Sequence, residues 1–201
     1  MQTLNQLRFP RWMRGIFIAN LVAQSGIIVT GAVVRLTGSG LGCPTWPQCV
    51  EGSYTPTARQ EEAFHKYIEF GNRLLTFVLV IIAIAVLVSI FIDARRRKRL
   101  GVPQRWAIIV LAIIPFVGTA AQAVLGGITV LTGLNPLIVS AHFLVSILLV
   151  AAAVALVARS GDIGDRPVVY LAPTPVRSLS WLLVGVAAVV VVLGVITTGS
   201  G

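Results

Sequence analysis

Five apolar runs dominate this sequence, and each is long enough to cross a lipid bilayer. They occupy residues 14–36, 66–92, 106–131, 137–158 and 179–198. A transmembrane helix needs roughly 20 mostly apolar residues, because in hydrocarbon its backbone polar groups must bond within the segment. Only 11% of the residues are charged, whereas soluble domains carry about 25%. We therefore predict an all-α integral membrane protein: a four-helix transmembrane bundle followed by a fifth transmembrane helix.

The net charge of +9 is concentrated in alternate connections between these runs. Twelve of the sixteen Lys and Arg residues lie before the first run, between the second and third, or between the fourth and fifth: Arg8, Arg11, Arg14, Arg95, Arg96, Arg97, Lys98, Arg99, Arg105, Arg159, Arg166 and Arg177. We therefore predict a multi-pass protein of the cell membrane. The positive-inside rule places these connections and the N-terminus in the cytoplasm. Segments 37–63 and 132–136 then lie outside. Because topology accounts for the basic runs, we expect no nucleic-acid partner.

Both cysteines fall in the first outer segment, within "GSGLGCPTWPQC". Cys43 and Cys49 face an oxidising compartment in this topology, which favours a disulfide. A metal site is a weaker alternative, since two thiolates without a neighbouring Cys or His complete no tetrahedral shell. Free thiols are the remaining alternative.

The second run begins with polar side chains, in "HKYIEFGNRLL". His65, Glu69, Asn72 and Arg73 lie in its first, outer turns and share one stripe of a helix that advances about 100° per residue. Charged groups in a membrane normally face a bundle interior or a cavity, so this stripe predicts a functional site. Simpler readings stay open: Glu69 and Arg73 form an i, i+4 pair that neutralises itself, and His65 is solvated at the interface.

The other runs bring polar residues to the same depth. In "NPLIVSAHF" the Asn-Pro start predicts a capped helix, which places His142 roughly 9 Å below the outer surface. Arg35 ends the first run and Gln122 lies in the outer half of the third. Arg35 also has the simpler reading of a side chain that snorkels to the headgroups, and Gly126 and Gly127 that of plain helix packing.

Inward imidazoles in a four-helix bundle are a common way to hold haem. His142 is the candidate ligand of the iron, because an imidazole inside an apolar helix needs a partner or a metal. Arg35 and Arg73 at the rim would suit the two haem propionates. These residues favour a cofactor pocket near the outer face, with haem as the candidate occupant.

The motifs "GAVVRLTGSGLGCPTWPQC", "IEFGNRLLT", "QAVLGGITVLTGLNPLIVSAHF" and the terminal "TGSG" together resemble the N-terminal part of bacterial haem A synthases. The resemblance implies a membrane oxidoreductase of terminal-oxidase biogenesis, which oxidises a methyl group of haem O to a formyl group with oxygen from water. It implies eight helices in two similar halves, with substrate haem in the first half and a haem b cofactor in the second. The expected partners are haem O synthase and cytochrome oxidase assembly factors, and a homo-oligomer is left open.

By resemblance, His142 matches the iron ligand on the fourth helix and Glu69 the acid implicated in activity. Arg73 matches the arginine of the family's E-x-x-H-R motif, and the outer cysteine pair has a structural or a redox role. Asn72 is a departure, because it stands where the motif has a histidine. Either His65 substitutes as the second ligand, or the iron is five-coordinate on His142 alone.

"TGSG" occurs at 37–40 and again at 198–201, which suggests that the fifth helix repeats the end of the first. We expect a substrate-haem half at 1–158, a cytoplasmic linker at 159–178 and the start of an incomplete second half at 179–201, without activity by itself. Two other functions remain open: a membrane electron carrier like cytochrome b, which Asn72 disfavours, and a transport or structural subunit, for which Pro115 is the main feature.

Overall fold

The structure is a computed structural model that describes residues 8–58, 60, 63–162 and 171–199. Five helices account for most of these residues: α2 (Arg11–Leu36), α3 (His65–Arg99), α4 (Trp106–Leu131), α5 (Pro136–Arg159) and α6 (Thr174–Gly199). All five are long and apolar enough to cross a membrane. The predicted all-α membrane fold is confirmed.

Helix boundaries agree with the hydropathy pattern to within one residue except at three ends, of which the start of α2 at Arg11 rather than 14 is the smallest difference. Helix α3 continues past residue 92 to Arg99, because Arg and Lys are good helix formers and the following turn returns to the helix: Arg97 Nε donates to Pro103 O at 2.7 Å. Helix α6 begins at Thr174 rather than 179. Its Pro175 lies in the first turn, where the missing N–H costs no helical bond. The second copy of "TGSG" extends beyond the described residues.

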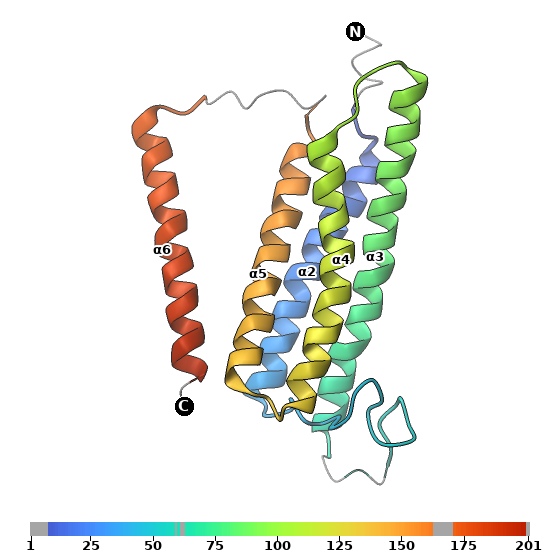
Figure 1. Ribbon diagram of the computed structural model, residues 1–201, viewed down its shortest axis with the longest axis vertical. Coiled ribbons are helices and arrows are strands. Elements are labelled where there is room, and N and C mark those ends of the chain that lie inside the picture. Colours follow the sequence, from blue (N-terminus) through green and yellow to red (C-terminus); the bar gives the residue numbers. More distant parts are fainter. Residues whose placement is uncertain (1–7, 59, 61–62, 163–170, 200–201) are drawn as a thin grey trace. The chain divides into compact units, whose positions relative to one another are not determined.

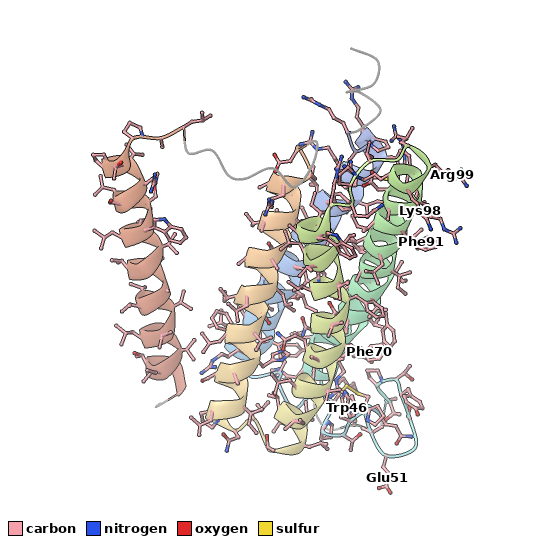
Figure 2. The ribbon with its side chains drawn as sticks, turned by 45° about the horizontal axis from the view of Figure 1, so that its top comes forward. Trp46, Glu51, Phe70, Phe91, Lys98 and Arg99 are labelled. Atoms are coloured by element: carbon pink, nitrogen blue, oxygen red, sulfur yellow. A yellow bond between two sulfur atoms is a disulfide. The ribbon has the colours of Figure 1, made fainter. Side chains whose placement is uncertain are left out.

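Helices α2 to α5 form a four-helix bundle in which each packs against two neighbours (Figure 1). Helix α2 contacts α3 and α5, and α4 contacts the same two. We call the end with the α3–α4 turn the basic end, and the end with the 37–64 loop the loop end. Figure 2 shows Lys98 and Arg99 at the basic end, and Trp46 and Glu51 at the loop end.

The main cluster of buried hydrophobic residues lies toward the basic end. Its buried members are Phe9, Met13, Phe17, Val86, Ile90, Ile108, Ala112 and Leu156. Helices α4 and α5 approach closely further along, since a Cβ on Gly118 would overlap the side chain of Leu149. Helix α6 belongs to a separate unit, residues 166–201, and carries exposed apolar side chains such as Trp181. Such a surface suits contact with lipid or with another helix.

A polar bridge crosses the middle of the bundle. Gln24 Nε2 of α2 donates to Thr119 Oγ1 of α4 at 3.2 Å, and Gln24 is 4% exposed. One turn away Asn20 is fully buried, and among the described residues neither its Nδ2 nor its Oδ1 has a hydrogen-bond partner. These two amides were not predicted as a polar bridge, although their i, i+4 spacing in an apolar helix is visible in the sequence.

We expect Gln24 and Thr119 to stabilise the bundle together. A double-mutant cycle of Gln24→Leu and Thr119→Val, read from denaturation in detergent, should give a coupling energy of about 0.6 kcal/mol, the usual size for hydrogen bonds between membrane helices. Strictly additive single effects would show that the two side chains do not stabilise each other in the folded protein.

Candidate active site at the loop end

The loop after α2 is closed by a disulfide and folds onto the first turns of α3. Cys43 and Cys49 are bonded, with Cα atoms 4.3 Å apart, which confirms the predicted pairing. Their exposed fractions are 0% and 1%, so the disulfide is shielded from solvent. Gly42 lies directly on the α3 backbone, because a Cβ there would be 2.5 Å from the carbonyl oxygen of His65.

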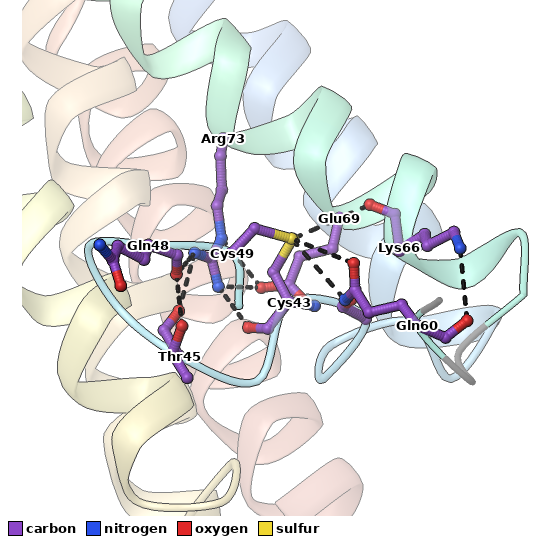
Figure 3. Close-up of polar contacts among 9 residues, drawn as sticks. Cys43, Thr45, Gln48, Cys49, Gln60, Lys66, Glu69 and Arg73 are labelled. Carbon is purple, nitrogen blue, oxygen red and sulfur yellow. Dashed lines mark hydrogen bonds and ion pairs between the residues drawn. A yellow bond between two sulfur atoms is a disulfide. The ribbon is translucent and has the colours of Figure 1, made fainter. Parts of the chain in front are cut away.

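Arg73 is the centre of the contacts that hold this loop (Figure 3). Its Nη2 donates to Cys43 O at 2.6 Å, and its Nη1 donates to Thr45 O at 2.9 Å and to Gln48 O at 3.2 Å. Its Nε and Nη2 also donate to Glu69 Oε1, at 3.0 and 2.5 Å. One guanidinium therefore satisfies three loop carbonyls and one carboxylate oxygen. The planar fork of arginine suits this arrangement better than an ammonium.

Glu69 links the helix to the loop from the other side of the ion pair. Its Oε2 accepts a hydrogen bond from the backbone N–H of Cys43 at 2.7 Å, and the residue is 5% exposed. Both carboxylate oxygens thus accept from fixed donors. A buried carboxylate is tolerated when it is paired and hydrogen-bonded in this way.

The remaining polar residues at the start of α3 also have partners in the loop. Lys66 Nζ donates to Thr57 O at 2.8 Å and to Gln60 O at 3.3 Å. His65 Nδ1 lies 2.8 Å from Ser39 Oγ, and its ring stacks on Phe64. The polar beginning of this membrane helix is therefore explained first by the loop that covers it.

Asn72, at the position where the related motif has a histidine, faces α2. Its Oδ1 accepts a hydrogen bond from Thr30 Oγ1 at 2.7 Å. This contact joins the two helices one turn below the loop. An amide oxygen engaged in this way is an interhelical contact rather than a free ligand.

His142 lies apart from that cluster, on α5 and against α4. Its backbone oxygen accepts from Gln122 Nε2 and from Ser146 Oγ, each at 2.9 Å. The ring faces Gly126, where an added Cβ would come within 3.4 Å of Cε1. The buried Nδ1 of His142 has no hydrogen-bond partner among the described residues, and neither has Oε1 of Gln122. The ring therefore has a buried Nδ1 without a partner in the described part of the chain, and its Cε1 edge lies against Gly126.

Trp46 was not singled out from the sequence, although it lies between the two cysteines. Its ring covers Gly127, where an added Cβ would lie 2.5 Å from Cδ2. The loop therefore contacts α4 as well as α3. Arg35 occupies the last turn of α2. Within the described part of the chain, no group of three or more His, Cys, Asp or Glu residues could hold a metal ion by protein ligands alone.

The geometry defines a multi-pass helical membrane protein with a covered polar site at one end of a four-helix bundle. A profile of the family described as cytochrome oxidase assembly protein matches residues 14–201. Among curated relatives, a protein named heme A synthase from Geobacillus thermodenitrificans is 32% identical over 143 residues, which are 71% of this chain and 39% of that protein. Another from Bacillus mycoides is 29% identical over 163 residues, 79% of this chain and 47% of the relative.

The chain belongs to the cytochrome oxidase assembly protein family, and the resemblance to haem A synthases is confirmed. It spans less than half the length of these curated relatives. No solved structure gives a significant match.

Arg73 should protect the disulfide. Arg73→Gln removes the donors of three carbonyls and one carboxylate. We expect the loop to open more often in this variant. A phosphine should then reduce Cys43–Cys49 in detergent at a rate about tenfold or more above that of the wild type, because reduction requires local opening. Arg14→Gln, an exposed charge removed at the basic end, is the control and should leave the rate unchanged. Equal rates in all three proteins would contradict a loop held by Arg73.

Gly42 should not tolerate a side chain. In Gly42→Ala the new Cβ meets backbone atoms of His65 and Lys66 at 2.5–2.7 Å, so the loop must shift, at a cost of roughly 1–3 kcal/mol. Thermal unfolding in detergent measures this loss. Gly71→Ala is the matched control: nothing lies within 4 Å of its Cβ, and Ala is favoured over Gly in a helix. A stable Gly42→Ala variant would rule out the close contact.

Proposed function

We propose that this chain is the N-terminal, substrate-binding half of a haem A synthase. Haem O would bind between the helices of the α2–α5 bundle near the loop end. The observation that carries the proposal is the buried Nδ1 of His142, which has no hydrogen-bond partner among the described residues, on a ring whose Cε1 lies against Gly126. A buried polar atom without a partner is costly in a natural protein and commonly marks a missing ligand. The family match and the relatives named heme A synthase support the same function.

His142 is the proposed ligand of the haem iron. Asn72 would not complete an axial pair, since its amide oxygen is engaged by Thr30. His65 as a second ligand would have to leave Ser39. We therefore favour iron held by His142 alone on the protein side. An open coordination position suits a haem that is bound as a substrate to be modified.

Glu69 is proposed to accept protons during the reaction. Conversion of a methyl to a formyl group consumes one water and releases four protons and four electrons. A positioned carboxylate can take up protons in such steps. Here Arg73 and the Cys43 N–H hold that carboxylate in place. Arg35 and Arg73 are the proposed contacts of the propionates. Arg73 would have to give up hydrogen bonds to the loop or to Glu69 to bind one, because all five of its N–H groups donate there.

The membrane location, the haem b cofactor and the protein partners are also part of this proposal. The protein would lie in the cytoplasmic membrane, with its basic end in the cytoplasm and the disulfide loop outside. Haem b, which supplies an electron acceptor, would be held by the second half of the family's eight-helix organisation. Haem O synthase and cytochrome oxidase assembly factors are the proposed partners.

Haem titration tests the proposal. Adding haem O to the purified protein in detergent should produce a Soret band. His142→Ala should weaken haem binding by about tenfold or more, because it removes the proposed ligand of the iron. His65→Ala is the matched control, because the chain contains two histidines. It should bind as the wild type does. Added imidazole should restore the band in His142→Ala.

Two outcomes would contradict these assignments. Loss of binding in His65→Ala but not in His142→Ala would move the iron to the other histidine. No binding in the wild type, repeated on a chain extended to the length of the relatives, would exclude a haem site in this half.

A further inference from the structure

The basic run at the end of α3 divides into side chains that hold the fold and side chains that do not. Residues 93–105 carry six basic residues and one acid, Asp93. Arg97 is 5% exposed and donates to Pro103 O. Arg105 is 1% exposed, with Nε 3.9 Å from Asp93 Oδ2 and its guanidinium over the ring of Phe9. These two arginines are required for the α3–α4 turn.

Arg96 and Arg99 face the other way. Together with Ile92 and Leu100 they line an open cavity of about 500 Å³ on the outside of α3. Spacings of four, seven and eight residues from Ile92 place all four on one helix face at about 100° per residue. The two other basic residues are not in this cavity: Arg95 stacks over Phe91, 4.2 Å from the ring centroid, and Lys98 is exposed. Figure 2 shows Phe91, Lys98 and Arg99 along this end of α3.

The depth of the cavity follows from the Asp93–Arg105 pair. That pair places Asp93 at the depth of the start of α4. Two tryptophans near this end are exposed: Trp106, the first residue of α4, by 67%, and Trp12, near the start of α2, by 52%. Exposed tryptophans mark the membrane–water interface. Arg96 and Arg99 lie about 4.5 and 9 Å beyond Asp93 at about 1.5 Å per residue, and Ile92 lies on the hydrocarbon side. The cavity therefore spans the boundary between acyl chains and headgroups.

The charge around the cavity is strongly positive. Asp93 is the one acid among residues 93–105 and forms its ion pair with Arg105, and Arg96 brings a positive charge to the cavity. Arg99 adds a further charge. Guanidinium groups bind phosphate oxygens in pairs of hydrogen bonds. The face proposed to be cytoplasmic also meets the leaflet that is rich in anionic lipid.

We propose that this cavity is a binding site for an anionic phospholipid. Arg96 and Arg99 bind the phosphate, and the upper part of an acyl chain lies along Ile92. The site is separate from the proposed haem site, because it is at the opposite end of the bundle.

Native mass spectrometry of the full 201-residue protein, released from detergent with added dioleoylphosphatidylglycerol or dioleoylphosphatidylcholine, tests the site. The wild type should retain phosphatidylglycerol in preference. Arg96→Gln/Arg99→Gln should lower its apparent affinity about tenfold or more, as expected for two basic groups near a phosphate. Arg95→Gln/Lys98→Gln removes the same charge from the same run outside the cavity and should change affinity less than about threefold. Circular dichroism melting checks that both variants fold.

Three results would overturn the proposal. Equal losses of phosphatidylglycerol affinity in the two double variants would mean that binding depends on the total positive charge of residues 95–99 and not on this cavity. A wild type without preference for phosphatidylglycerol would remove the site altogether. Displacement of the lipid by excess inorganic phosphate would identify a site for a free anion instead.

Discussion

The hydrogen bonds of Arg73 are the constraint on which the loop end depends. A loop of nearly thirty residues above a membrane bundle has many backbone carbonyls, and those that are buried need donors. Arg73 supplies donors to three of them, while Glu69 both neutralises the guanidinium and accepts the Cys43 N–H. The disulfide then closes a loop whose two ends are already fixed on α3. The carbonyls that Arg73 holds belong to Cys43, Thr45 and Gln48, on both sides of Trp46, whose ring covers Gly127.

The same ion pair sets the limits of the chemistry at this end. Glu69 is committed to two structural partners, so any part it takes in proton transfer must be combined with holding the loop. The Nδ1 of His142 has no such partner among the described residues, and its Cε1 lies against Gly126. The two groups therefore differ: Glu69 holds the loop in place, and His142 is the residue that we propose for the ligand. This division of roles follows from contacts, and the sequence motif alone does not reveal it.

Hydropathy was sufficient to locate all five helices, because the bilayer imposes length and composition on any segment that crosses it. It failed at the end of α3, since the helix continues into charged residues that favour helix but not lipid. The disulfide was predictable from topology and compartment. The partners of Lys66, Glu69 and Arg73 were not, because they are backbone groups of a loop, and no periodicity encodes its path. The buried amides Asn20 and Gln24 were visible as a spacing but were overlooked.

The loop also imposes an order on assembly. Arg73 and Glu69 pair with each other along α3, but their remaining hydrogen bonds need the loop that precedes them in the chain. Helix α2 comes first in the sequence and delivers that loop, so the cost of burying the two charges falls only once α2 has crossed. The partners of α3 are thus synthesised and placed before α3 itself. Directional synthesis of the chain solves a solvation problem that the isolated helix could not.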